Sequence, residues 1–153
     1  MRTAVVGIGN EMKGDDGIGI RVAKQLQEDW PAAREKDTLV IPAEVPENYI
    51  QPIIRFRPEL LILVDASDFQ GKAGDVRAIR EEEVSSVYTN THSVPILLFL
   101  EAIKKEVPNL RTVFMGIQPK STQFGKPMSP EVREAGRKAG DAIRKIASGE
   151  VNV

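Results

Sequence analysis

Four ionisable side chains lie at positions where parallel α/β folds usually bind their ligands. Asp15 and Asp16 end a glycine-rich segment, GIGNEMKGDDG, that follows the first apolar run of the chain. Asp65 directly follows the continuous apolar run LLILV, and His92, the only histidine, precedes a helical pattern. In open α/β sheets, ligands bind beyond the carboxyl ends of the strands. We therefore expect Asp16, Asp65 and His92 to converge in one crevice.

Two carboxylates and one imidazole would suit a borderline divalent metal ion and would leave coordination positions open. An incomplete set of this kind is what a protein needs if the metal arrives already held by a substrate. Each residue also has an ordinary explanation. Asp15 and Asp16 could cap a helix and complement its dipole, Asp65 could cap a loop, and a lone histidine is often structural or exposed.

The glycine-rich segment departs from the two common nucleotide-binding loops. A dinucleotide fingerprint would need a third glycine where Met12 stands. A phosphate loop fits the spacing of Gly9 and Gly14, but Asp15-Asp16 replaces its lysine and hydroxyl residue. Two carboxylates repel phosphate, so the segment is better suited to a cation or a proton.

Apolar patterns along the chain predict strands that alternate with helices. Amphipathic spacing and helix-start residues predict the helices, including one that begins after Ser93 and one that begins at Ser129-Pro130. Strands are expected over residues 2–7, 38–41, 60–64, 76–79 and 112–117, and helices over residues 16–30, 46–56, 93–106 and 130–146. This order predicts an α/β fold, a three-layer α/β/α sandwich with a twisted, mostly parallel sheet of about five strands. We expect one domain over residues 1–153.

Composition excludes several functional classes. The 153 residues carry a net charge of -1, which gives no electrostatic reason to expect nucleic acid as a partner. There is no cysteine, so disulfides, thiolate metal sites and a cysteine nucleophile are all excluded. No apolar run is long enough to insert in a membrane, and the N-terminus lacks the features of a signal peptide. We expect a cytoplasmic protein.

Four blocks of the sequence resemble the hydrogenase maturation endopeptidases. GIGNEMKGDDGIGIRVA resembles the opening strand, glycine loop and acidic helix start of that family, and LLILVDASD resembles its central strand. THSVPILLFLE and VFMGIQPKSTQFGKPMSPEV resemble the branch that serves formate-hydrogenlyase and related energy-converting hydrogenases. The resemblance runs from residue 2 to about residue 146.

The resemblance implies an activity and assigns residues to it. Members of the family cut a C-terminal extension from the precursor of the nickel-iron hydrogenase large subunit after nickel insertion, and the new chain end then closes over the active site. The family's three nickel-recognition positions fall on Asp16, Asp65 and His92. The nickel would come with the substrate, and no tightly bound cofactor of its own is expected. Apart from the resemblance, the loops over residues 44–49 and 121–128 are expected to set specificity, because they lie beside the proposed crevice.

The sequence leaves the mechanism open. Nickel could act as a Lewis acid or only as a recognition handle, with Asp16 or Asp65 as general base. A serine triad around His92 lacks an elbow motif. Two other functions compete with the protease: a hydrogenase assembly factor that binds without cutting, and a receiver-type phosphoacceptor module in which Asp15-Asp16, Asp65 and Lys120 would form the site.

Overall fold

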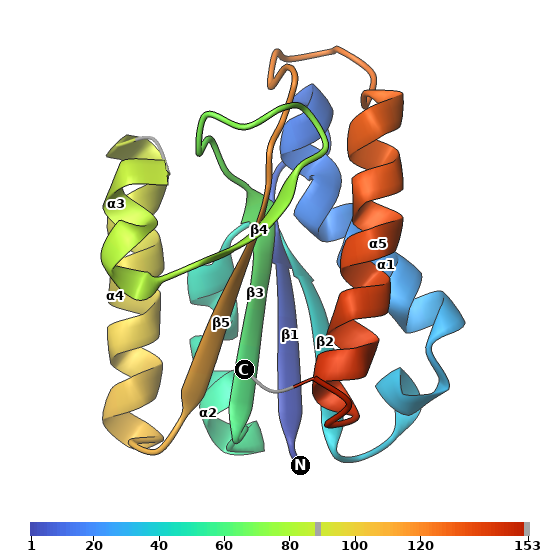
Figure 1. Ribbon diagram of the computed structural model, residues 1–153. Coiled ribbons are helices and arrows are strands. Elements are labelled where there is room, and N and C mark those ends of the chain that lie inside the picture. Colours follow the sequence, from blue (N-terminus) through green and yellow to red (C-terminus); the bar gives the residue numbers. More distant parts are fainter. Residues whose placement is uncertain (88–89, 152–153) are drawn as a thin grey trace.

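The computed structural model describes residues 1–87 and 90–151, except for the side chains of residue 85, residue 87 and residues 90–94. Its centre is a five-stranded sheet in the order β2-β1-β3-β5-β4 (Figure 1). β1 (Thr3–Ile8), β2 (Thr38–Ala43), β3 (Leu60–Ala66) and β5 (Arg111–Ile117) are parallel, and β4 (Val76–Ile79) pairs antiparallel with β5 at one edge. The predicted mostly parallel sheet of five strands is confirmed.

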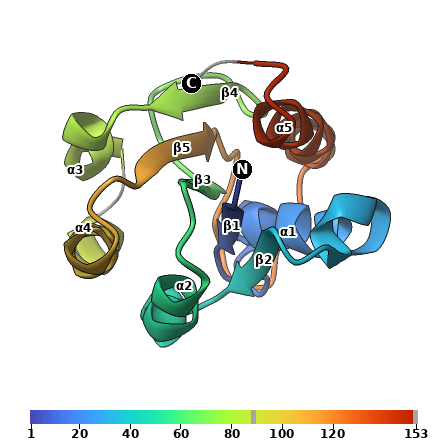
Figure 2. The same ribbon diagram turned by 90° about the horizontal axis from the view of Figure 1, so that it is seen from below.

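Helices cover both faces of this sheet (Figure 2). α1 (Ile18–Asp29) and α5 (Pro130–Ala147) pack together on one face, over a core that includes Val5, Ile62 and Val64. α2 (Ile50–Phe56), the short α3 (Val84–Val87) and α4 (Asn90–Glu106) lie on the other face, over a core that includes Val6 and Leu63. Alternate residues of each central strand therefore enter opposite cores, as the pleat of a strand requires. The three-layer arrangement is confirmed.

Several element boundaries differ from the predictions. β3 continues through Ala66, so Asp65 belongs to the strand rather than following it. The predicted helix over residues 16–30 divides into the 3₁₀ turn Gly14–Gly17 and α1, and the one over residues 46–56 divides into the 3₁₀ turn Pro46–Tyr49 and a short α2. The prediction that Ser93 caps α4 is wrong, because the helix begins at Asn90. Pro95 lies inside the helix, where its ring removes one hydrogen bond to the preceding turn.

A pair of glycines brings the start of α1 against the sheet. A Cβ atom on Gly7 would collide with the backbone carbonyl of Gly19, and a Cβ atom on Gly19 would collide with the carbonyls of Ile8 and Val64. Only glycine permits so close a backbone approach. The contact holds the turn that precedes α1 directly above the carboxyl ends of β1 and β3.

In the part of the chain that the structure describes, none of the helices has both the length and the apolar character that crossing a membrane requires.

Candidate functional site

The candidate site lies at the carboxyl ends of the central strands, at the top of the view in Figure 1. The chain passes from β1 to β2 on one side and then returns to β3 on the other side of β1, so the strand order reverses between β1 and β3. Loops that leave such neighbouring strands in opposite directions open a crevice between them. A pocket of about 290 Å³ lies at this end of the sheet.

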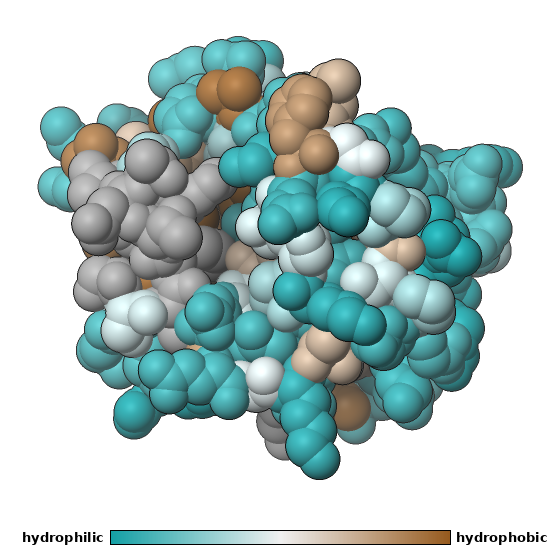
Figure 3. Space-filling model, turned by 90° about the horizontal axis from the view of Figure 1, so that it is seen from above, coloured by the Kyte–Doolittle hydropathy of each residue, from teal (hydrophilic) through white to brown (hydrophobic). Residues whose placement is uncertain are grey.

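Three segments form the wall of the pocket. The loop after β1 contributes Asn10, Lys13 and Asp16. The segment after β2 contributes Glu44, Val45, Pro46 and Glu47, and the first half of α4 contributes Pro95 and Ile96. The segment after β2 overlaps the loop over residues 44–49 that the sequence analysis connects with specificity. The face of the molecule around this end is mostly hydrophilic, with a few apolar side chains among the polar ones (Figure 3).

Asp16 lies in the 3₁₀ turn and faces the pocket with a partly buried side chain. The backbone N–H of Asn10 donates both to Oδ2 of Asp16, at 3.1 Å, and to its backbone carbonyl, at 3.2 Å. These bonds close the loop upon itself and hold the carboxylate in place.

Asp65 lies near the end of β3 with only 3% of its surface exposed. Burial raises the pKa of its carboxyl well above the usual range, and the negative charge of Asp16 raises it further, while the hydrogen bond from Ala66 N to Oδ1, at 2.7 Å, acts in the opposite direction. The two carboxylates are therefore near enough to interact electrostatically. A carboxyl with a raised pKa retains a proton more readily than an exposed one, and carboxylates so arranged can bind a cation once ionised.

His92 belongs to α4 by its backbone, but its side chain lies outside the described part of the structure. Pro95 and Ile96, which line the pocket, follow it within one turn of the same helix. The described side chains include no group of three acidic or histidine residues able to hold a metal ion. Asp16 lines the pocket, and Asp65 lies near enough to interact with it electrostatically. That Asp16, Asp65 and His92 together hold a metal stays a prediction.

Asp15 has a function in the structure that the sequence analysis missed. Its carboxylate is fully buried and accepts four hydrogen bonds, from Lys120 N (2.9 Å), Ser121 N (3.1 Å), Ser129 N (2.7 Å) and Ser129 Oγ (2.8 Å). Burial acts to raise the pKa of this carboxyl, but the bonds from Ser129, Lys120 and Ser121 outweigh it and hold the pKa below its usual range. Asp15 thus joins the loop after β1 to the loop after β5.

The helix-cap explanation for the two acids is wrong. Neither the 3₁₀ turn nor α1 has a side-chain cap at its start, because Asp15 is turned toward the β5–α5 loop and Asp16 toward the pocket. The partners of Asp15 lie 105 to 114 residues away along the chain. A pattern of local spacing contains no information about such partners.

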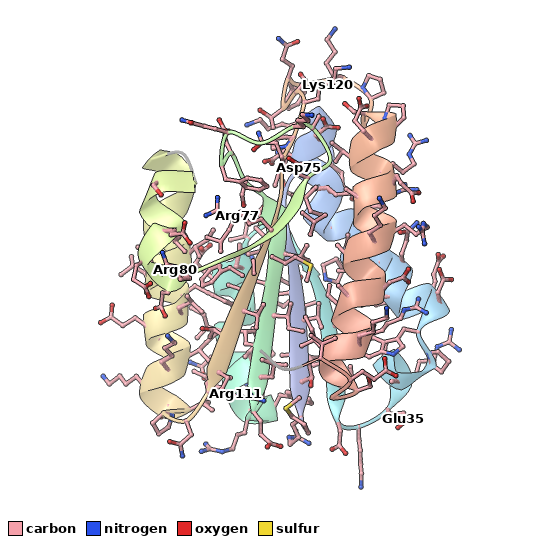
Figure 4. The ribbon with its side chains drawn as sticks, viewed as in Figure 1. Glu35, Asp75, Arg77, Arg80, Arg111 and Lys120 are labelled. Carbon is pink, nitrogen blue, oxygen red and sulfur yellow. The ribbon has the colours of Figure 1, made fainter. Side chains whose placement is uncertain are left out.

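The receiver-type alternative does not fit this geometry. Lys120 has a 64% exposed side chain, and its ammonium pairs with Glu131 at 3.9 Å, while its backbone N–H is what contacts Asp15. Figure 4 shows Lys120 at the outer end of the molecule, beyond the strands. The Asp15 carboxylate is occupied by its buried hydrogen-bond donors and so cannot take part in a phosphate site. The Lys120 ammonium pairs with Glu131 rather than with Asp65.

Comparison with known proteins places the chain among proteases that mature hydrogenases. The family model described as hydrogenase maturation protease (HycI) matches residues 20–146. The hydrogenase 3 maturation protease of Escherichia coli is 31% identical over 137 residues, which cover 88% of this chain and 84% of that protein.

Solved structures agree. The crystal structure of the [NiFe] hydrogenase maturation protease HycI from Thermococcus kodakarensis KOD1 has a TM-score of 0.84 at 30% identity, covering 96% of this chain and 92% of the other. The solution structure of the endopeptidase HycI from E. coli has a TM-score of 0.80 at 28% identity, covering 99% and 93%. The chain belongs to the hydrogenase maturation protease family.

Proposed function

We propose that this protein is an endopeptidase that removes the C-terminal extension from the precursor of a nickel-iron hydrogenase large subunit once nickel has been inserted. It recognises the substrate-held nickel through Asp16, Asp65 and His92. The observation that carries the proposal is that Asp16 lines a pocket at the strand switch point, close enough to the buried Asp65 to interact with it electrostatically. Family membership supplies the reaction class.

The chemistry of the acid pair supports docking of a divalent metal. Carboxylate oxygens bind a metal ion when they are ionised, and a doubly charged cation offsets both the burial of the Asp65 charge and its repulsion by Asp16, which together raise the pKa of Asp65. Binding of nickel-loaded precursor therefore favours the ionised form of Asp65. Nickel-free precursor provides no such compensation, so the pair discriminates between the two states of the substrate.

Docking of the metal also places the scissile bond. Asp65 lies near the end of β3, and Asp16 lies in the 3₁₀ turn before α1, where Asn10 holds it, so the metal is fixed relative to the sheet. Holding a reacting group in a defined position supplies several kcal/mol of barrier reduction. We propose that this positioning is the main contribution of the site.

A cleavage assay resolved by mass spectrometry tests the proposal. Nickel-loaded and nickel-free precursor are each incubated with the wild type, His92→Ala, Asp16→Asn and Asp65→Asn. Asp29→Asn serves as the control, because Asp29 is an exposed acid at the end of α1. We expect one cut near the precursor's C-terminus, only with nickel, retained in the control and lost in the three site variants.

Other results have defined meanings. Equal cutting of nickel-free precursor would contradict recognition through nickel. Cutting that survives in Asp16→Asn and Asp65→Asn would remove both acids from the site. Tight binding of the precursor without any cutting would favour the assembly-factor alternative.

A further inference from the structure

The loops after β1 and β5 form one continuous structure next to the pocket, which we call the rim and define as residues 10–14 and 120–127. Besides the bonds to the Asp15 carboxylate, Asp15 N donates to Ser121 O at 2.9 Å and Gly125 N donates to Met12 O at 2.8 Å. Met12 N in turn donates to Oδ1 of Asn10 at 2.9 Å. The rim is therefore ordered before any partner arrives.

This ordered rim exposes two large apolar side chains. Met12 is 63% exposed and Phe124 is 69% exposed, the highest values among the large hydrophobic residues of the described chain. The hydrogen bond between Gly125 and Met12 brings their two loops together, and Lys13 next to Met12 is part of the pocket wall. An aromatic side chain exposed on an ordered backbone loses little conformational freedom on binding, which is typical of an interface anchor.

The size of the pocket indicates why a protein substrate needs such a surface. A volume of about 290 Å³ is at the lower end for small-molecule sites, which are roughly 300–1,000 Å³, and it admits only a short segment of chain. Stable protein complexes bury about 800 Å² on each partner. A precursor whose scissile segment enters the pocket must therefore also contact the surface around it, and the rim adjoins the pocket through Lys13.

Charge indicates the kind of surface that the rim fits. Lys13, Lys120 and Lys126 lie in the rim, and its one acid is Glu11. Glu11 pairs with Lys24 at 2.8 Å, and Lys120 pairs with Glu131 at 3.9 Å, so the three lysines still outnumber the acid within the rim. The rim is therefore apolar at its centre and positively charged around it. A complementary surface is apolar with acidic residues at its edge.

We infer that Met12 and Phe124 are docking residues that bind the large-subunit precursor beside its scissile segment, against an apolar surface edged by acidic residues. This inference rests on the proposed function and names the part of the protein that selects the substrate. Phe124 lies in the loop over residues 121–128, where specificity is expected, whereas Met12 lies in the glycine-rich loop.

Binding and cleavage measured together test the inference. The affinity for nickel-loaded precursor is measured for the wild type, Met12→Ala, Phe124→Ala, the double variant and Leu98→Ala. Leu98, on α4, is 59% exposed and provides a matched control outside the rim. We expect the double variant to bind about 10- to 100-fold more weakly, as anchor residues do, with KM raised more than kcat is lowered. The control stays within about twofold, and binding weakens with added salt.

The outcomes separate the docking surface from the protease activity. Rim variants that bind as tightly as Leu98→Ala would overturn the inference while leaving the protease proposal intact. Precursor that binds through the rim but is not cut would overturn the protease proposal alone. A wild type that self-associates through Phe124, and loses this association rather than precursor affinity on substitution, would assign the rim to a second copy of the chain and overturn the inference.

Discussion

Replacing Asp15 by alanine removes a fully buried carboxylate that accepts four hydrogen bonds. A hydrogen bond to a charged group contributes about 1.5–3 kcal/mol, but four bonds to one group are not additive, and the variant also avoids the cost of burying the charge. We therefore expect Asp15→Ala to lower the free energy of unfolding by about 3–5 kcal/mol at pH 7.

Two milder substitutions separate the contribution of the charge on Asp15 from that of a single hydrogen bond. In Asp15→Asn, an amide oxygen at the Oδ2 position still accepts from Lys120, Ser121 and the Ser129 hydroxyl, but the amide nitrogen faces Ser129 N, so we expect a loss of about 1–3 kcal/mol. Ser129→Ala removes a single hydroxyl donor and is expected to cost about 1 kcal/mol. Urea unfolding followed by the fluorescence of Trp30, the only tryptophan, measures all three.

The stability that Asp15 contributes depends on pH. Because the folded pKa of Asp15 is lowered, its ionised form stabilises the fold above the unfolded pKa of about 3.9. This contribution is lost as the pH falls through the lower folded pKa, so the difference between wild type and Asp15→Asn should shrink in acid. Asp141→Asn, which breaks an exposed pair with Arg137, is the control and should change stability by less than about 0.5 kcal/mol. A loss below about 1 kcal/mol in Asp15→Ala, or a difference that persists unchanged in acid, would refute the assigned role.

Three other predictions concern the site and its support. Gly19→Ala should lower the free energy of unfolding by about 3 kcal/mol or more, and with it the melting temperature, because the new Cβ atom would meet backbone carbonyls. Gly140→Ala is the control, because its Cβ atom would make ordinary contacts in α5, and it should be neutral or stabilising by about 0.5–1 kcal/mol; equal effects of the two substitutions would contradict the close approach. Asp65→Asn should have a higher melting temperature than the wild type at pH 7, because the raised pKa of Asp65 in the folded protein means that its ionisation destabilises the fold. This difference in melting temperature should vanish below about pH 4, where the carboxyl is protonated in the unfolded chain too. A lower melting temperature of the variant at pH 7 would be inconsistent with the burial of Asp65. Cleavage should fall as the pH drops through about 6.5, where imidazole protonates and no longer binds metal; a flat rate from pH 8 to 5 would argue against His92 as a ligand.

Patterns within a single element predicted most of the fold. The apolar run LLILV identified a central strand buried on both faces, and Ser129-Pro130 located the start of α5. These signals succeed because the period of burial is a local property of each strand or helix. Boundaries were less accurate at Asp65 and Ser93, where hydrogen bonding in the folded chain extends β3 and α4 beyond the patterned residues.

The site was predictable in part for a related reason. Strand ends in a parallel sheet meet at one edge, so the proximity of Asp16 and Asp65 follows from topology. The different directions of the Asp15 and Asp16 side chains do not follow from topology. They depend on whether a loop from another part of the chain lies nearby with unsatisfied backbone N–H groups. The segment that supplies these groups, residues 120–129, carries no apolar period that would position it.

The link between Asp15 and Ser129 spans 114 residues, which has a consequence for the order in which the protein is made. Chains are synthesised from the N-terminus at about 5–20 residues per second, and long-range contacts form after local ones. The acidic turn is thus made among the first residues, but the backbone donors that complete it are translated several seconds later. We expect a nascent chain that has already built the central strands to lack the rim, so that it acquires the ability to hold a substrate only after residue 129 has emerged from the ribosome.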